Sequence, residues 1–174
     1  TIVQTQWKHI LLDMLLTIES AGLLADAEDI TIAVAGDGTL QVTNLVSIYG
    51  QRFAKVKVIQ VSNSSETWEF ESINSIISRA SHIHSKGGDA HFLYIHTKGL
   101  NMANGDYVAK WFWRKGLEKW VVVEHEYCRW LLHEGFDAVG VNAIDHISEN
   151  AERGRVNINH AWHYSGNFWW ATLS

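Results

Sequence analysis

The chain has 174 residues, 47% of them hydrophobic, and a formal net charge of -5. This length and hydrophobic content predict one domain over residues 1–174 with a substantial core, and the lack of any Lys or Arg block excludes a typical nucleic-acid binder. No apolar run is long enough for a membrane span, and the N-terminus lacks a signal-peptide layout. The single cysteine, Cys128, cannot form an internal disulfide and favours a reducing compartment. These features predict a soluble, cytoplasmic protein.

Helices and strands are predicted to alternate along the chain. Helices are marked by apolar residues three and four positions apart, and strands by short β-branched or aromatic runs. The expected strands cover 1–4, 30–35, 56–61, 90–96 and 136–142. The expected helices cover 7–21, 42–49, 63–84 with Asn63 as its N-cap, and 107–133, the last interrupted at Gly116 and ended by Gly135. The alternation predicts an α/β domain with a mostly parallel central sheet and helices on both faces.

Polar residues and glycines follow the predicted strands. Ligands of parallel sheets bind at the carboxyl ends of the strands, so these positions form the expected binding edge. The positions are Gly36, Asp37, Asn63, the run from His96 to Gly99, and Asn142.

The run His96-Thr97-Lys98-Gly99 carries groups that can hold a phosphate or diphosphate. Lys98 supplies a charge, Thr97 a hydroxyl, and Gly99 lets the backbone approach a ligand. A solvated turn after a strand is the alternative, and the chain contains neither a Walker loop nor a dinucleotide fingerprint. Arg114 is a second phosphate candidate, although a surface ion pair with Glu118 explains it equally well.

Other catalytic arrangements have less support. His82, His84 and His91 lack the cysteine companions or the His-Glu-x-x-His helix of a zinc site, and no Gly-x-Ser-x-Gly elbow occurs. Asp37 and Asp137 lie next to strands, where each could activate an acceptor or bind a sugar hydroxyl, or simply form a turn.

The segment 163–171, His-Tyr-Ser-Gly-Asn-Phe-Trp-Trp-Ala, joins polar groups to three consecutive aromatic residues. Sugars need both, because their hydroxyl edges take hydrogen bonds and their C–H faces lie on aromatic rings. Core packing is the alternative explanation for the aromatic residues.

Several motifs in this order resemble those of GT-A-like glycosyltransferases from bacteria and large viruses that build surface glycans. The resemblance covers most of the chain and rests on six segments: Ser20 to Leu24, Trp68 to Phe70, Tyr94 to Gly99, Trp113-Arg114 with Leu117-Glu118, Phe136 to Asn142, and His163 to Ala171. It implies a GT-A-like (Rossmann-like) fold and transfer of a sugar from a nucleotide-diphosphate sugar, a UDP-sugar being favoured, to a glycan acceptor. The short first strand and the end soon after Trp170 are compatible with a domain trimmed from a longer protein.

The site expected from the residues and from this resemblance has three parts. The catalytic candidates are Asp137 and His163. The donor-binding candidates are Gly36, Asp37, Asn63, His96, Thr97, Lys98, Gly99, Arg114, Asn142, Ser165, Gly166, Asn167 and Trp169. The Asp-x-Asp metal motif common in GT-A enzymes is absent, which leaves two alternatives. Either a divalent metal, Mn²⁺ or Mg²⁺, is bound by other ligands, for which His163, in a late His-x-x-Gly segment, and His96 are the candidates, or Lys98 and Arg114 neutralise the diphosphate without a metal. Two other functions remain open: a non-catalytic sugar-binding module with aromatic platforms, and a methyltransferase that binds its cofactor at Gly36-Asp37-Gly38.

Overall fold

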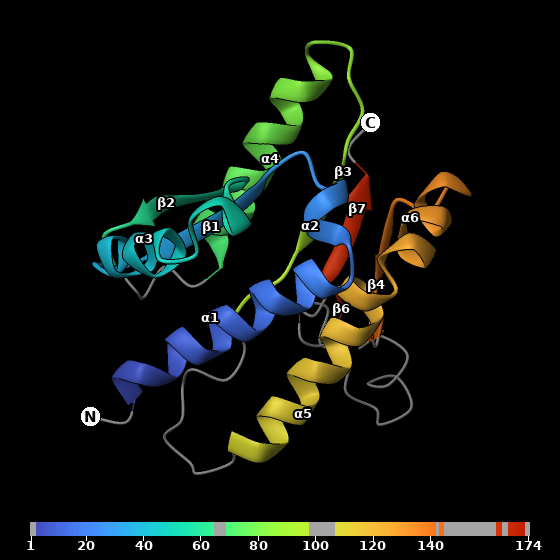
Figure 1. Cartoon of the computed structure of the whole chain (residues 1–174). Coiled ribbons are helices and arrows are strands. Elements are labelled where there is room, and N and C mark those ends of the chain that lie inside the picture. Colours follow the sequence, from blue (N-terminus) through green and yellow to red (C-terminus); the bar gives the residue numbers. More distant parts are fainter. Residues whose placement is uncertain are drawn as a thin grey trace, which may run out of the picture. The chain divides into compact units, whose positions relative to one another are not determined.

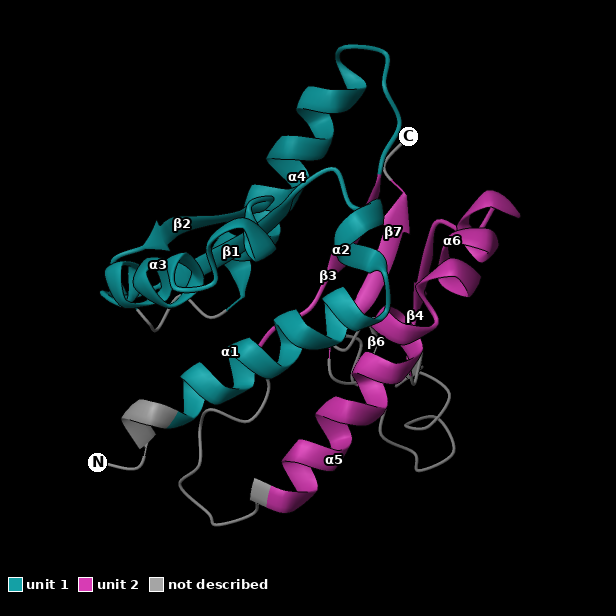
Figure 2. Ribbon diagram, viewed as in Figure 1, with its two compact units in different colours: residues 1–90, 173–174 teal, residues 91–172 magenta. Residues whose placement is uncertain are grey.

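The computed structural model describes residues 3–64, 69–97, 107–141, 143–144, 163–164 and 167–172. The chain divides into two compact units, Thr1–Ala90 with Leu173–Ser174 and His91–Thr172, which we call unit 1 and unit 2 (Figure 2). In the described ranges, no helix has both the length and the apolar character that crossing a membrane requires.

Unit 1 contains helices packed on a pair of parallel strands (Figure 1). Its elements are α1 (Val3–Ser20), α2 (Leu23–Asp26), β1 (Ile30–Ala35), α3 (Thr39–Ser47), the 3₁₀ helix η1 (Gly50–Phe53), β2 (Val56–Ser62) and α4 (Phe70–His84). These elements confirm the predicted helices and strands at 7–21, 30–35 and 56–61. The predicted strand at 1–4 is wrong, since α1 already begins at Val3, four residues before Trp7 and thus in phase with its helical repeat.

The core of unit 1 forms between α1, α3 and η1. Leu11, Leu15, Val42, Val46 and Phe53 are buried together. Alternate residues of each strand pack against this cluster, namely Ile32 and Val34 of β1 and Val56 and Val58 of β2. Because side chains two apart point to one face of a strand, the helical cluster covers one face of the β1–β2 pair.

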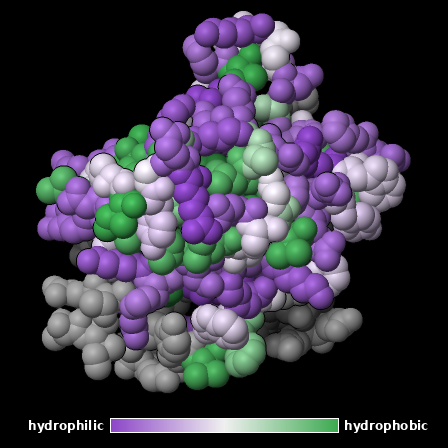
Figure 3. Space-filling view, viewed as in Figure 1, coloured by the Kyte–Doolittle hydropathy of each residue, from purple (hydrophilic) through white to green (hydrophobic). Residues whose placement is uncertain are grey.

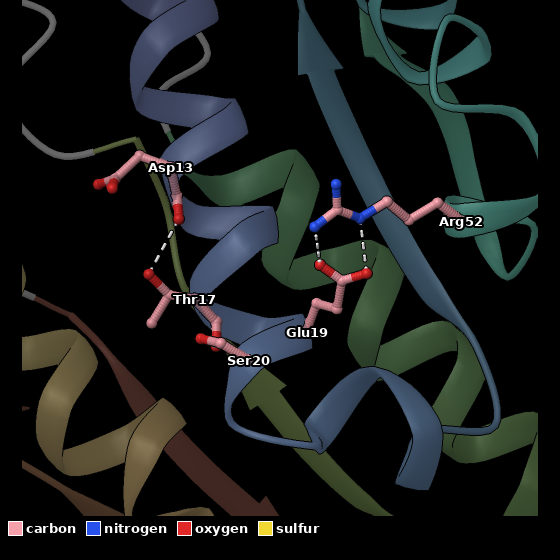
Figure 4. Close-up of polar contacts among 5 residues, drawn as sticks. All are labelled: Asp13, Thr17, Glu19, Ser20 and Arg52. Atoms are coloured by element: carbon pink, nitrogen blue, oxygen red, sulfur yellow. Dashed lines mark hydrogen bonds and ion pairs between the residues drawn. The ribbon is translucent and has the colours of Figure 1, made fainter.

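An ion pair joins η1 to the end of α1 (Figure 4). Arg52 donates from Nε to Glu19 Oε1 at 2.7 Å and from Nη2 to Glu19 Oε2. This hydrogen bonding lowers the pKa of Glu19. One turn earlier, the Thr17 hydroxyl donates to the Asp13 carbonyl at 2.9 Å, and α1 ends before Gly22, whose φ of 82° suits glycine.

The helix predicted from Asn63 begins later than expected. The structure starts α4 at Phe70, with Glu69 in the N-cap position. Asn63 Oδ1 instead accepts a hydrogen bond from Gln60 Nε2 at 2.8 Å, so this side chain is bonded to a residue near the end of β2. Glu66, which follows Asn63 by three residues as the second member of a capping box would, lies outside the described residues.

Unit 2 combines a three-stranded sheet with a helical region. Its elements are β3 (His91–Tyr94), α5 (Tyr107–Glu118), the π-helix η3 (Lys119–Val123), α6 (His125–His133), β4 (Ala138–Gly140), β5 (Ala143–Ile144), β6 (His163–Tyr164) and β7 (Trp169–Thr172). The sheet order is β3-β7-β4, and β7 runs antiparallel to both neighbours, so β3 and β4 are parallel to each other. β5 and β6 form a separate antiparallel pair. The chain is therefore α/β, but the described strands do not establish a single, mostly parallel sheet.

The helical region of unit 2 changes direction at η3, not at the predicted Gly116. Gly116 stays within α5, because one glycine costs a helix only about 1 kcal/mol. The break comes at Glu124, whose N–H donates to the Lys119 carbonyl in the wider hydrogen-bonding pattern of a π-helix. Three consecutive carbonyls of η3 accept side-chain hydrogen bonds: Trp120 O from Cys128 Sγ at 3.2 Å, Val121 O from Trp170 Nε1 at 2.7 Å, and Val122 O from His125 Nδ1 at 3.0 Å.

Candidate functional site

The carboxyl ends of β3 and β4 lie at one edge of the sheet in unit 2. Tyr94 at the end of β3 and Gly140 at the end of β4 both pair with Trp169, the first residue of β7. The segments that leave these strands, His96-Thr97 and Val141, therefore start at the same edge as Asn167. This arrangement brings four predicted donor residues to one place: His96, Thr97, Asn167 and Trp169.

Aromatic contacts fix the His96 ring at this edge. The ring lies edge-on to Phe168, with centroids 5.4 Å apart at 70°, and stacks beside Tyr94 at 6.1 Å and 15°. The Trp169 ring also stacks on Tyr94, with ring centroids 5.4 Å apart and an interplanar angle of 29°. Tyr94 and Phe168 are buried, whereas His96 and Trp169 are half-buried. The half-buried rings thus stand on a buried aromatic base and keep part of their surface open to a ligand.

Asn167 shapes the start of β7. It has a φ of 54°, the left-handed conformation that asparagine tolerates better than most residues, and its Oδ1 accepts a hydrogen bond from Trp169 Nε1 at 2.8 Å. The side chain therefore holds the Trp169 indole in its stacked position. Asn167 is a residue that orients an aromatic wall of the candidate site.

Unit 1 has its own carboxyl edge, where Gly36 and Asn63 are brought together. Gln60 Nε2 donates to the Gly36 carbonyl at 3.2 Å and to Asn63 Oδ1, while Gly36 N–H donates to the Ser62 carbonyl at 2.9 Å. Gly36 is buried with a φ of 93°, which requires glycine at this turn, and Asp37 is exposed. A shallow hollow of unit 1 lined by Val46, Phe53 and Val58, among others, includes none of the predicted residues.

Arg114 is buried, which corrects the expectation of a surface pair. Its Nε lies 3.1 Å from Glu118 Oε1, and the two side chains are 2% and 1% exposed. Lys115 Nζ, 26% exposed, lies 2.8 Å from Glu118 Oε2. The guanidinium is thus enclosed with a carboxylate and is not open to a diphosphate in this structure.

Asp137 lies at the opposite end of the sheet from His96. It precedes the first residue of β4, and its carbonyl accepts a hydrogen bond from Thr172 N–H, at the end of β7, at 3.1 Å. His91, at the start of β3, pairs with Thr172 and meets the His133 ring at a centroid distance of 4.8 Å. Burial, with nearby His133 and Arg129, lowers the pKa of His91.

Several predicted residues lie outside what the structure describes. They are Lys98, Gly99, Asn142, Ser165 and Gly166, and of His163 the backbone alone is described, paired with Ile144. Across the described ranges, no three His, Cys, Asp or Glu side chains are grouped so as to hold a metal ion.

Three residues of these edges were not predicted as functional. Gln60 bridges the unit 1 turns, and Tyr94 and Phe168 form the base beneath His96. Tyr94 could have been found from its place at the end of a strand, two residues before His96. Gln60 has no such signal, since a polar residue in a strand usually marks an exposed position.

Comparison with known proteins identifies no relative: no protein-family model, no curated protein and no solved structure matches this chain.

Proposed function

We propose that the chain is a glycosyltransferase domain that transfers a sugar from a nucleotide-diphosphate sugar, with a UDP-sugar favoured, to a hydroxyl of a glycan. The observation that carries this proposal is the convergence of His96, Asn167 and Trp169 at the carboxyl edge of β3. An imidazole, a carboxamide and a half-buried indole in one place suit a ligand that combines hydroxyls with flat faces.

Transfer to a glycan hydroxyl requires stabilisation of the leaving diphosphate. Lys98 directly follows the described edge residue Thr97 in sequence and is the proposed source of positive charge. Arg114 takes no part in this proposal, because its guanidinium is buried against Glu118. Asp137 is not proposed as the base, because it lies at the other end of the sheet.

A GT-A-like fold with a mostly parallel sheet is part of the same proposal. Within each unit the strand directions are compatible with it, since β1 is parallel to β2 and β3 is parallel to β4. A metal at His163 or His96 is a weaker element, because His96 is held among aromatic rings and, among the described residues, no three His, Cys, Asp or Glu side chains are grouped to hold a metal ion. No step of the proposed reaction is routed through a metal.

A thermal-shift panel tests the proposal. The full chain is heated with UDP, GDP, CMP or S-adenosylmethionine, each with and without Mn²⁺. A nucleotide at a hundred times its Kd adds about 2.7 kcal/mol of stability, equivalent to a rise in Tm of about 5–10 °C for a chain of this size. We expect UDP to produce this shift.

Matched histidine variants connect the shift to the site. His96→Ala should lose the UDP shift, while His84→Ala, at an exposed position near the end of α4, should retain it. Glycan binding without any nucleotide shift would instead support a sugar-binding module, and a shift with S-adenosylmethionine alone would support a methyltransferase. Either outcome would refute the glycosyltransferase proposal.

A further inference from the structure

Helix α5 exposes apolar side chains and buries charged ones. Arg114 and Glu118 are almost fully buried, whereas Val108 and Phe112 are each 64% exposed. Helices at a protein surface usually have the opposite arrangement, with charged residues facing water. An apolar outer surface on a helix that encloses an ion pair indicates a contact with another apolar phase or molecule.

Six exposed residues lie on one side of α5 and the start of η3, and the exposed Trp111 and Trp113 flank them. Val108 and Phe112 are four residues apart, and Lys119 lies seven residues after Phe112. Ala109 and Gly116 are seven residues apart, and Trp120 lies four residues after Gly116. Spacings of four and seven residues place side chains on the same side of a helix. All six are exposed, and we call them the α5 outer face, which extends into the first two residues of η3. Figure 3 shows hydrophobic atoms at the surface over the lower end of α5 as it is drawn in Figure 1.

This part of the chain is locally positive. Residues 107–120 contain four basic residues, Lys110, Arg114, Lys115 and Lys119, and one acidic residue, Glu118, which gives +3 in a chain of net charge -5. Glu118 and Arg114 are both buried and lie against each other, so the surface charge of this part of the chain comes from its lysines. Lys119 is exposed, and its Nζ lies 5.6 Å from the centre of the Trp120 ring, which places an ammonium beside an exposed indole.

We propose that the α5 outer face docks on an anionic lipid surface, with the helix axis in the plane of the membrane. Trp and Phe side chains favour the boundary between headgroups and acyl chains, and lysines beside them attract anionic headgroups. The 12 residues of α5 extend about 18 Å, which suits a helix lying on a membrane. A second copy of the chain is a poorer occupant, because two such faces would bring the exposed Lys119 of one copy towards that of the other with no exposed carboxylate on either face to pair with them.

Co-sedimentation with lipid vesicles tests this proposal independently of any nucleotide. The full chain is mixed with vesicles of phosphatidylcholine alone or with about one third phosphatidylserine. We expect binding to the anionic vesicles at least about fivefold tighter than to the neutral ones, and weaker at high salt because ions screen the lysines.

Two pairs of variants separate the apolar and charged contributions. Phe112→Ser should weaken binding about tenfold or more, while Ile48→Ser, at a position 77% exposed in unit 1, should leave it unchanged. Lys119→Glu should weaken it at least about fivefold, and Lys86→Glu, with the same change of net charge at another exposed lysine, should have less effect.

Three results would overturn the proposal. The first is no sedimentation with anionic vesicles. The second is equal loss of binding in the test and control variants. The third is a dimer in solution that Phe112→Ser dissociates, which would assign the α5 outer face to a second copy of the chain. Glycosyl transfer plays no part in this assay, so its outcome is separate from that of the proposed function.

Discussion

Replacing Trp170 with Phe removes a hydrogen bond that joins β7 to the π-helix. Trp170 is 4% exposed, and its Nε1–H donates to the Val121 carbonyl at 2.7 Å. Loss of a buried hydrogen bond of this kind costs about 1 kcal/mol, and the space left by the smaller ring about 1 kcal/mol more. The expected loss is therefore about 2 kcal/mol, or a fall in Tm of about 4–8 °C.

Urea denaturation followed by far-ultraviolet circular dichroism measures this loss. Trp120→Phe is the matched control, because Trp120 is 52% exposed and the same substitution there should change stability by less than about 0.5 kcal/mol. If Trp170→Phe and Trp120→Phe lose the same stability, and so denature at the same urea concentration, the Trp170 indole does not stabilise the π-helix.

Two further predictions concern His91 and Asn167. Because the pKa of His91 is lowered in the folded chain, its neutral form favours folding, so stability should fall as pH drops below the ordinary value of 6.5 towards the lowered pKa. Urea midpoints at several pH values should show less of this fall in His91→Gln than in a His84→Gln control. Asn167→Ala should cost about 2 kcal/mol, from the lost Trp169 hydrogen bond and the left-handed backbone, whereas Asn167→Gly should recover about 1 kcal/mol of it. Equal urea midpoints for the Ala and Gly variants would show that the backbone at position 167 is not strained.

The sequence predicted helices and strands well where local patterns decide the structure. The β-branched run at 30–35 became β1, and the apolar spacing after Trp7 became most of α1. Gly135 ends the helical region with a φ of 99°, as expected from the freedom of glycine. These features depend on neighbours within a few residues, so the sequence pattern contains the information needed to predict them.

Features that depend on distant partners were missed. The break after η3 is accompanied by hydrogen bonds from Cys128 and from Trp170, a residue 49 positions beyond Val121. Arg114 and Glu118 pair as their i, i+4 spacing predicted, but that spacing does not predict that the two side chains are only 2% and 1% exposed. Periodicity alone cannot report such burial, because it does not show which side of a helix the rest of the chain covers.

The consecutive tryptophans of β7 show how one strand can serve both a site and a scaffold. Successive side chains of a strand point to opposite faces, so Trp169 stacks on Tyr94 while Trp170 reaches the π-helix. The segment 163–171 was predicted to be either sugar-binding or packing residues, and the structure assigns a packing role to Trp170 in particular. Because the two residues share a strand, a change that loosens Trp170 from Val121 should also disturb the position of Trp169. Core packing and the candidate site are thus physically coupled through β7.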